Sequence, residues 1–204
     1  MHKTVLFFLA LVILCAGCLS LSTLQTARVL QENESQFGAA ASINSNYTLL
    51  LIEEDSEFIN TRPLLDFNGT FEAFYRTSIN NNLDIGMKAY FMGAIIDGKY
   101  QLHDGERFAI AADLGIGYNR FLGDDPILDF YPTLLMTFDL SKNVDLTFAP
   151  KIIITRFISG VTESSTLLGG TMMLTFGKFM PEIGYYVSED DNIATFSVGM
   201  NLNR

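Results

Sequence analysis

The stretch FAIAADLGIGY, residues 108–118, decides the fold class of this chain. Apolar side chains stand at every second position from Phe108 to Tyr118, and small or polar residues such as Asp113 fill the positions between them. Successive side chains of a β-strand point to opposite faces, so a period of two indicates a strand with one apolar and one polar face.

The same alternation recurs from residue 36 to the end of the chain. It predicts about ten strands of roughly 9–13 residues, the length of a strand that crosses a bilayer at a tilt. No segment after the N-terminal region shows the period of a helix. We therefore expect an all-β fold, a single antiparallel up-and-down β-barrel.

The polar face of these strands indicates which side points inward. A solvent-facing side would be dense in Lys and Glu, whereas this one is mostly Gly, Ala, Ser and Thr with single charges between them. Small residues suit the lumen of a narrow barrel, and an almost uncharged apolar face suits hydrocarbon. Charged residues make up only 18% of the chain and the mean hydropathy is +0.25. We predict a transmembrane barrel with a polar, small-residue lumen.

Residues 1–17 have the features of a signal peptide. A short polar start at Lys3 precedes an apolar run that ends at Leu14, and small residues lead up to Cys18. The sequence LCAGC, residues 14–18, resembles a bacterial lipobox, although Cys15 stands where that motif usually has Leu. The alternatives are an ordinary signal peptide or an uncleaved anchor that continues through Leu24.

The lipobox and the strands together resemble bacterial outer-membrane β-barrel lipoproteins. The resemblance implies a lipoprotein signal peptide over 1–17, a lipid-anchored tether over 18–35 and a β-barrel domain over 36–204. It implies a covalent lipid on Cys18 and a place in the outer membrane of a Gram-negative cell envelope. Implied partners are outer-membrane lipid and the machineries for barrel assembly and lipoprotein sorting. With both termini periplasmic, the periplasmic turns are 78–82, 103–106, 141–143 and 177–178, and the surface loops, which include 45–64, are mostly longer.

The cysteines and the net charge limit which covalent crosslinks and which partners the protein can have. The chain has no cysteine after Cys18, so the barrel contains no internal disulfide. Removal of residues 1–17 takes away Lys3 and no acid, which changes the net charge from −10 to −11. This negative charge argues against nucleic acid as a partner.

Charged residues on the predicted inner face form the main candidate site. Buried charges must be paired, so we expect a salt-bridged plug or a polar pore lining, and an excess of acids favours cations in any aqueous path. The predicted lumenal charges are Asp66, Glu72, Arg76, Asp84, Lys88, Asp97, Lys99, Asp113, Asp129, Asp145, Lys151 and Glu182.

A catalytic site is not expected. Serine hydrolysis needs a general base, and the one histidine after residue 17, His103, falls in a predicted polar turn. We predict no enzyme, no cofactor and no metal site, and a structural or weakly permeable barrel with a small, cation-preferring path. Two alternatives stay open: a soluble, lipocalin-like ligand-binding lipoprotein and a barrel enzyme that acts on membrane lipid.

Three prolines interrupt the predicted strands. Pro132, Pro150 and Pro181 each lack the backbone N–H that a strand donates to its neighbour. We expect bulges or bends in the strands at these positions.

Overall fold

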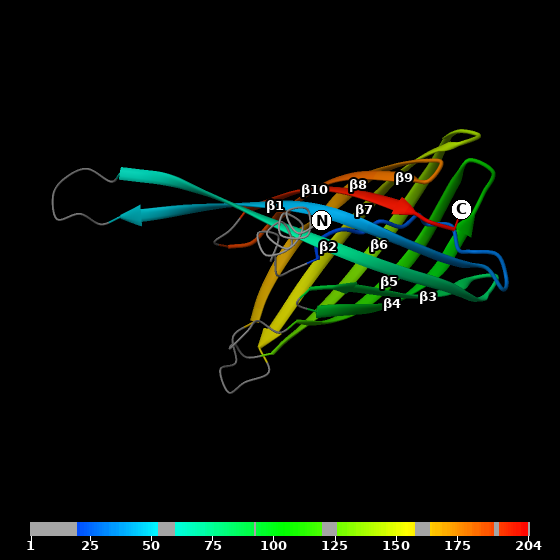
Figure 1. Ribbon diagram of the computed structural model, residues 1–204, viewed down its shortest axis with the longest axis horizontal. Coiled ribbons are helices and arrows are strands. Elements are labelled where there is room, and N and C mark those ends of the chain that lie inside the picture. Colours follow the sequence, from blue (N-terminus) through cyan, green and yellow to red (C-terminus); the bar gives the residue numbers. More distant parts are fainter. Residues whose placement is uncertain are drawn as a thin grey trace, which may run out of the picture.

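Antiparallel strands form a single closed barrel in the computed structural model, which describes residues 20–52, 60–91, 93–119, 126–157, 164–189 and 192–203 (Figure 1). The strands found in these residues are β1 (Ser35–Ile52), β2 (Asn60–Asn80), β3 (Leu83–Tyr90), β4 (Gly93–Asp104), β5 (Phe108–Asn119), β6 (Ile127–Ser141), β7 (Val144–Phe157), β8 (Ser164–Phe176), β9 (Phe179–Val187) and β10 (Asn192–Asn201).

Each strand pairs with its neighbours in the sequence, and β1 pairs with β10 to close the barrel. The closing register runs from Gly38 opposite Asn201 to Tyr47 opposite Asn192. The predicted all-β, up-and-down barrel is thus confirmed. Among the described residues, no helix is long and apolar enough to cross a membrane.

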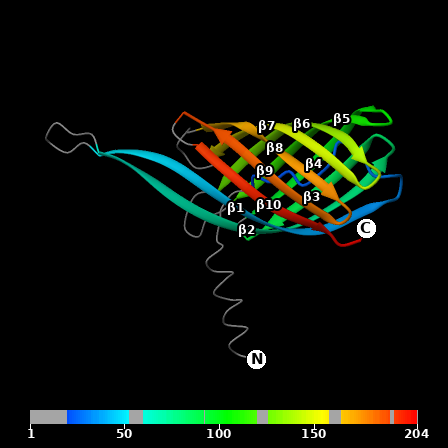
Figure 2. The ribbon, with the colours of Figure 1, turned by 90° about the horizontal axis from the view of Figure 1, so that it is seen from above.

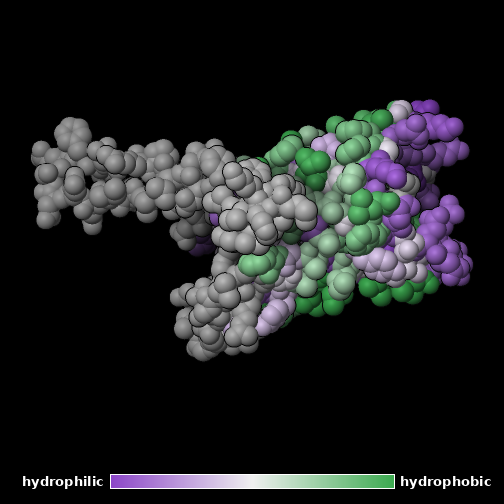
Figure 3. All heavy atoms as spheres, in the orientation of Figure 1, coloured by the Kyte–Doolittle hydropathy of each residue, from purple (hydrophilic) through white to green (hydrophobic). Residues whose placement is uncertain are grey.

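The apolar faces of the strands point outward. On β5 the outward Leu114 is 57% exposed, while its neighbour Asp113 is 8% exposed. Figure 3 shows hydrophobic side chains along the barrel wall and polar ones gathered at the end on the right. This arrangement confirms the predicted orientation, in which the lumen is polar and the outer wall is apolar, as in a barrel that faces hydrocarbon.

The two ends of the barrel differ. One end, here called the turn end, has the short connections 81–82, 105–107, 142–143 and 177–178. The opposite end, the loop end, includes the connections 53–59, 120–126 and 158–163. Exposed aromatic residues ring the outer wall near the turn end, as aromatic girdles do at a membrane interface. They include Phe37, Tyr75, Phe138, Phe176 and Phe179.

The hairpin of β1 and β2 extends past the other strands at the loop end (Figures 1 and 2). Pairing continues from Ser45 opposite Phe67 to Ile52 opposite Asn60. The sequence predicted a loop over residues 45–64, and this prediction is wrong at both of its ends. A two-stranded ribbon continues the backbone hydrogen bonds of the sheet without requiring further neighbours.

The prolines do not produce the expected bulges. Across Pro132 and Pro150 the β6–β7 register is unchanged, with Phe130 opposite Ile154 and Met136 opposite Phe148. The β8–β9 register is likewise unchanged on both sides of Pro181. Among the described residues, register shifts occur near the turn end, in the pairings of β2 with β3, β4 with β5 and β6 with β7. Loss of one N–H donor therefore leaves the alternation of faces intact.

Candidate functional site

The predicted lumenal charges line the inside of the barrel. Asp97 and Asp145 are partly buried, the side chain of Asp66 lies outside the described residues, and the other charges are buried. The buried members are Glu72, Arg76, Asp84, Lys88, Lys99, Asp113, Asp129, Lys151 and Glu182.

Some of these charges pair with one another across strands β2, β3 and β4. Arg76 on β2 donates to Asp97 on β4. Lys99 on β4 lies 3.2 Å from Asp84 on β3, measured from Nζ to Oδ2. Further toward the loop end, Lys88 Nζ lies 3.5 Å from Glu72 Oε2. These contacts supply part of the expected salt-bridged plug, because a buried charge needs a partner to offset its desolvation.

The N-terminal segment, residues 20–34, supplies the rest of the plug. It has neither helix nor strand and passes through the lumen before it turns into β1 (Figure 2). Leu21, Leu24 and Ala27 are each at most 3% exposed. The sequence predicts a tether over residues 18–35. The structure instead places residues 20–28 inside the barrel, where lumenal side chains bind their backbone.

Glu182 and two lysines hold the first part of the segment. The carboxylate of Glu182 accepts the backbone N–H groups of Thr23 at 2.8 Å and Leu24 at 3.0 Å. Lys88 donates to the carbonyl oxygen of Ser22 at 2.7 Å, and Lys151 donates to that of Leu21 at 3.1 Å. Backbone groups removed from water require such partners, so these charges fix an irregular chain where a strand ladder is absent.

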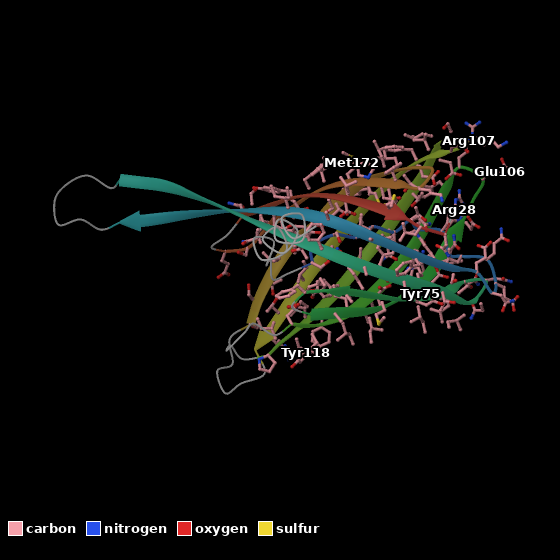
Figure 4. The ribbon with its side chains drawn as sticks, in the orientation of Figure 1. Arg28, Tyr75, Glu106, Arg107, Tyr118 and Met172 are labelled. Carbon is pink, nitrogen blue, oxygen red and sulfur yellow. The ribbon has the colours of Figure 1, made fainter. Side chains whose placement is uncertain are left out.

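The second part of the segment is held in the same way, nearer the turn end. Lys99 donates to the carbonyl oxygens of Thr26 at 3.0 Å and Arg28 at 2.6 Å. Thr137 accepts the N–H of Ala27 at 2.7 Å. Arg28 itself reaches the turn end, where it binds the carboxylate of Asp104 and, at 2.6 Å, that of Asp139 (Figure 4).

An apolar cluster closes around Leu21 at the loop end of the lumen. Leu21 packs among aromatic and branched side chains, and the hydroxyl of Tyr186 donates to its carbonyl oxygen at 2.9 Å. These inward apolar residues interrupt the polar face that the alternation predicted. The other members of the cluster are Tyr90, Ile95, Tyr131, Ile153, Leu167 and Ile193.

A hydrogen-bonded network beside this cluster holds Asp129. Asn119 donates to the carboxylate of Asp129, and so do Tyr131 at 3.2 Å and Thr155 at 2.6 Å. Tyr90 in turn donates to the side-chain oxygen of Asn119. The sequence predicts Asp129 as a lumenal charge but does not predict its neutral partners, because tyrosine and asparagine carry no charge that marks them.

The segment itself left a weak trace in the sequence. Leu21, Leu24 and Ala27 recur every three residues in a polar stretch, and they are the residues that the lumen buries. Gly199 in the wall also leaves room for Leu24, since a Cβ on Gly199 would lie 2.9 Å from the Cδ2 atom of Leu24. A tether in water would need neither feature.

Open space in the lumen is uneven. A cavity of about 40 Å³ borders Ser22, Leu24 and Lys88 in the middle of the barrel. A cavity of about 520 Å³ lies toward the turn end, beside Val29 and Gln31. The segment therefore fills the middle of the lumen and leaves a vestibule at the turn end.

His103 lies outside the lumen. It is exposed at the end of β4, and its ring centroid is 6.2 Å from that of Phe108. The described residues contain no group of three or more His, Cys, Asp or Glu side chains suited to hold a metal ion.

The two ends of the described chain lie at opposite ends of the barrel. Leu21 belongs to the cluster at the loop end, whereas Asn203 donates to the carbonyl oxygen of Ser35 at the turn end, at 2.6 Å. The sequence-based prediction has both termini on the periplasmic side. Cys18 lies outside the described residues.

The chain resembles known proteins in its architecture and not in its sequence. No family model and no curated protein matches the chain by sequence. Solved structures with a similar arrangement include Ail, the attachment invasion locus protein of Yersinia pestis, at 14% identity and a TM-score of 0.33 over 84% of this chain and 98% of Ail. Another is the translocator domain of the autotransporter NalP from Neisseria meningitidis, at 8% identity and a TM-score of 0.43 over 83% of this chain and 88% of that domain.

Proposed function

We propose that this chain is an outer-membrane β-barrel lipoprotein with a structural role in the bacterial envelope, and that its own N-terminal segment closes its lumen. The observation that carries the proposal is the course of residues 20–28 through a barrel whose outer wall is apolar. A covalent lipid on Cys18 adds a second attachment to the membrane.

The packing of the lumen supports low permeability. The 40 Å³ cavity beside Leu24 has room for only a few water molecules. A conducting path would have to displace a segment that Glu182, Lys88 and Lys151 hold through its backbone. Any conductance is therefore small.

The residual path prefers cations. Among the described residues, the buried lumenal acids Glu72, Asp84, Asp113, Asp129 and Glu182 outnumber the buried bases. The bases are Arg76, Lys88, Lys99 and Lys151. Surplus negative charge along a narrow passage attracts cations.

The two alternatives receive less support. A soluble, lipocalin-like barrel would turn its apolar face inward to hold a ligand, whereas here the apolar face points outward. An enzyme that acts on lipid would need a base in a site, whereas His103 is exposed beside a turn. We propose that the chain is not an enzyme.

Planar-bilayer recording of the purified full-length protein tests the closed lumen. We expect a small conductance that prefers cations, and a weaker preference in Asp113→Asn because one buried lumenal acid is lost. Glu106→Gln is the matched control, since Glu106 is exposed in a turn (Figure 4). A large, anion-selective conductance would contradict the proposal.

Processing of the precursor tests the lipid. Cys18→Ala should block lipidation and leave the precursor uncut, because the lipoprotein signal peptidase requires the modified cysteine. Gel mobility and the mass of the N-terminal peptide report the result. A mature protein of normal size from this variant would rule out the lipobox.

A further inference from the structure

Pairing of β6 with β7 is interrupted at the middle of both strands. Thr133 pairs with Lys151, and the nearest pairs on either side of it are three residues away. Pro132 stands in one of the two gaps and Pro150 in the other. Each proline keeps its pairing with the strand on its other side, which is β5 for Pro132 and β8 for Pro150. Both missing N–H groups therefore belong to the boundary between β6 and β7, here called the β6–β7 seam.

Two carbonyl oxygens of this seam lack the N–H that the opposite strand would donate. Opposed residues of antiparallel strands alternate between pairs that exchange two hydrogen bonds and pairs that exchange none. The register places Pro132 opposite Ile152, and it places Pro150 opposite Leu134. Gaps at these positions mark them as the pairs that exchange hydrogen bonds. Because proline can accept but not donate, the carbonyl oxygens of Ile152 and Leu134 receive no N–H across the seam.

An apolar groove lies over the seam on the outer wall of the barrel. Its volume is about 940 Å³, and the residues that line it include Pro132, Leu134, Pro150 and Ile152. Gly98 on β4 also lines it, and a Cβ on Gly98 would meet no atom within 4 Å. The two carbonyl groups without a donor thus belong to residues that line a hollow in the lipid-facing wall.

The depth of the groove decides what can bind these carbonyl groups. Leu134 is the central residue of β6 (Ile127–Ser141), so the groove lies at the middle of the apolar wall. Hydrocarbon contains no water that could donate to a carbonyl oxygen. A hydroxyl group among acyl chains equally lacks an acceptor. Each group is therefore the partner that the other needs at this depth.

The size of the groove favours a lipid chain over a protein as its occupant. Thirteen residues line it, whereas a standard protein interface uses about 20–30 residues a side. Large apolar side chains such as Leu114 and Leu168 border the groove, and an acyl chain can pack along them.

We propose that this groove is a binding site for a lipid whose acyl chain carries a hydroxyl group, which donates to the carbonyl oxygen of Leu134 or Ile152. The site requires the barrel to lie in a membrane, as the proposed function holds. It requires neither the lipid on Cys18 nor a closed lumen. Failure of the site therefore leaves the conductance and processing tests of the proposed function unaffected.

Native mass spectrometry of the full-length protein in detergent tests the site. Two phosphatidylcholines that differ only by a hydroxyl group near the end of one acyl chain are added at equal concentration. We expect the hydroxylated lipid to bind about three to thirty times more strongly, the range that one hydrogen bond gives within a membrane. Equal binding of the two lipids overturns the proposal.

Return of the N–H groups should remove the preference for the hydroxyl group. Pro132→Ala with Pro150→Ala supplies both missing donors to the seam, so this variant should bind the two lipids equally. Pro181→Ala is the matched control, because the β8–β9 pairing has a similar gap at Pro181, which does not line the groove. A preference that persists in the double variant, or that is lost in the control, contradicts the proposed donor and acceptor.

A larger side chain at Gly98 tests the groove itself. Gly98→Leu places its side chain in the open space of the groove and should abolish binding of both lipids. Ala73→Leu, on the exposed face of β2 away from the groove, is the matched control and should bind as the unaltered protein does. Full binding by Gly98→Leu would place the lipid elsewhere. Dimers that Gly98→Leu dissociates would make a second copy of the chain the occupant and overturn the proposal.

Discussion

At the scale of residues, the buried charges divide between two tasks. Arg76 and Asp97 pair with each other, whereas Glu182 binds the backbone N–H groups of Thr23 and Leu24. Lys99 does both, since it contacts Asp84 and two carbonyl oxygens of the segment. Charged side chains of this lumen therefore bind the backbone N–H and C=O groups that, in a strand, would bond to a neighbouring strand.

Removal of one partner from the Arg76–Asp97 pair should cost more than removal of both. Arg76→Met leaves a carboxylate that is only 11% exposed without its partner, and we expect a loss of about 3–5 kcal/mol in the free energy of unfolding. Arg76→Met with Asp97→Leu should recover most of that loss. Urea unfolding in lipid vesicles measures both, and a double variant as unstable as the single one would contradict a paired role.

Glu182 should hold the segment through its acceptor oxygens. Glu182→Leu leaves the N–H groups of Thr23 and Leu24 without acceptors, at a cost of about 1–3 kcal/mol each. We expect much faster hydrogen exchange at these two amides, with the amides of β8 unchanged. Glu182→Gln keeps one acceptor and should show an intermediate rate. Equal rates in all three proteins would mean that the segment does not depend on this side chain.

At the scale of elements, each strand separates hydrocarbon from a packed interior. On β6 the outward Leu134 and Leu140 are 39% and 58% exposed, whereas Thr133 and Thr137, which point into the lumen, are buried. The N-terminal segment forms an inner layer that binds side chains of β3, β4, β6, β7 and β9.

The depth of an outward residue should determine the cost of a charge. Leu134→Arg, near the middle of β6, should destabilise the barrel by about 2–4 kcal/mol, because the charge meets hydrocarbon. Leu140→Arg, the same change on the same face at the turn end, should cost about 0–1 kcal/mol. Unfolding from lipid vesicles compares them, and equal costs would mean that β6 does not cross the membrane.

At the scale of the whole molecule, the barrel has the reverse polarity of a water-soluble protein. Large apolar side chains lie exposed on the outside of its strands, and charges lie within. Figure 4 shows Tyr75, Tyr118 and Met172 on the outer side. Such a surface requires lipid or detergent, since contiguous exposed apolar area drives association in water.

Removal of detergent should therefore precipitate the purified, unlipidated protein. Light scattering during dialysis measures the result, and return into lipid vesicles should keep the protein monodisperse. A protein without lipid that stays monomeric in buffer would contradict the membrane-spanning barrel and favour the soluble alternative.

The sequence by itself determined the strands and the direction of their faces. Alternation such as that of FAIAADLGIGY is a local property, read within one strand, and it predicted both the barrel and the inward charges. It also survived Pro132 and Pro150, because a missing N–H removes a hydrogen bond without changing which side a residue faces.

Only the tertiary structure decided what fills the lumen. The bonds that hold the segment join residues far apart in the chain, such as Thr23 to Glu182 across 159 positions and Ala27 to Thr137 across 110. A polar stretch without periodicity looks the same in water as inside a barrel, because its backbone can bind either water or side chains. Pairing of β1 with β10 closes the barrel and gathers the inward charges of the strands around one axis. Because these charges bind the backbone of the segment, the segment lies in the lumen and not in the solvent.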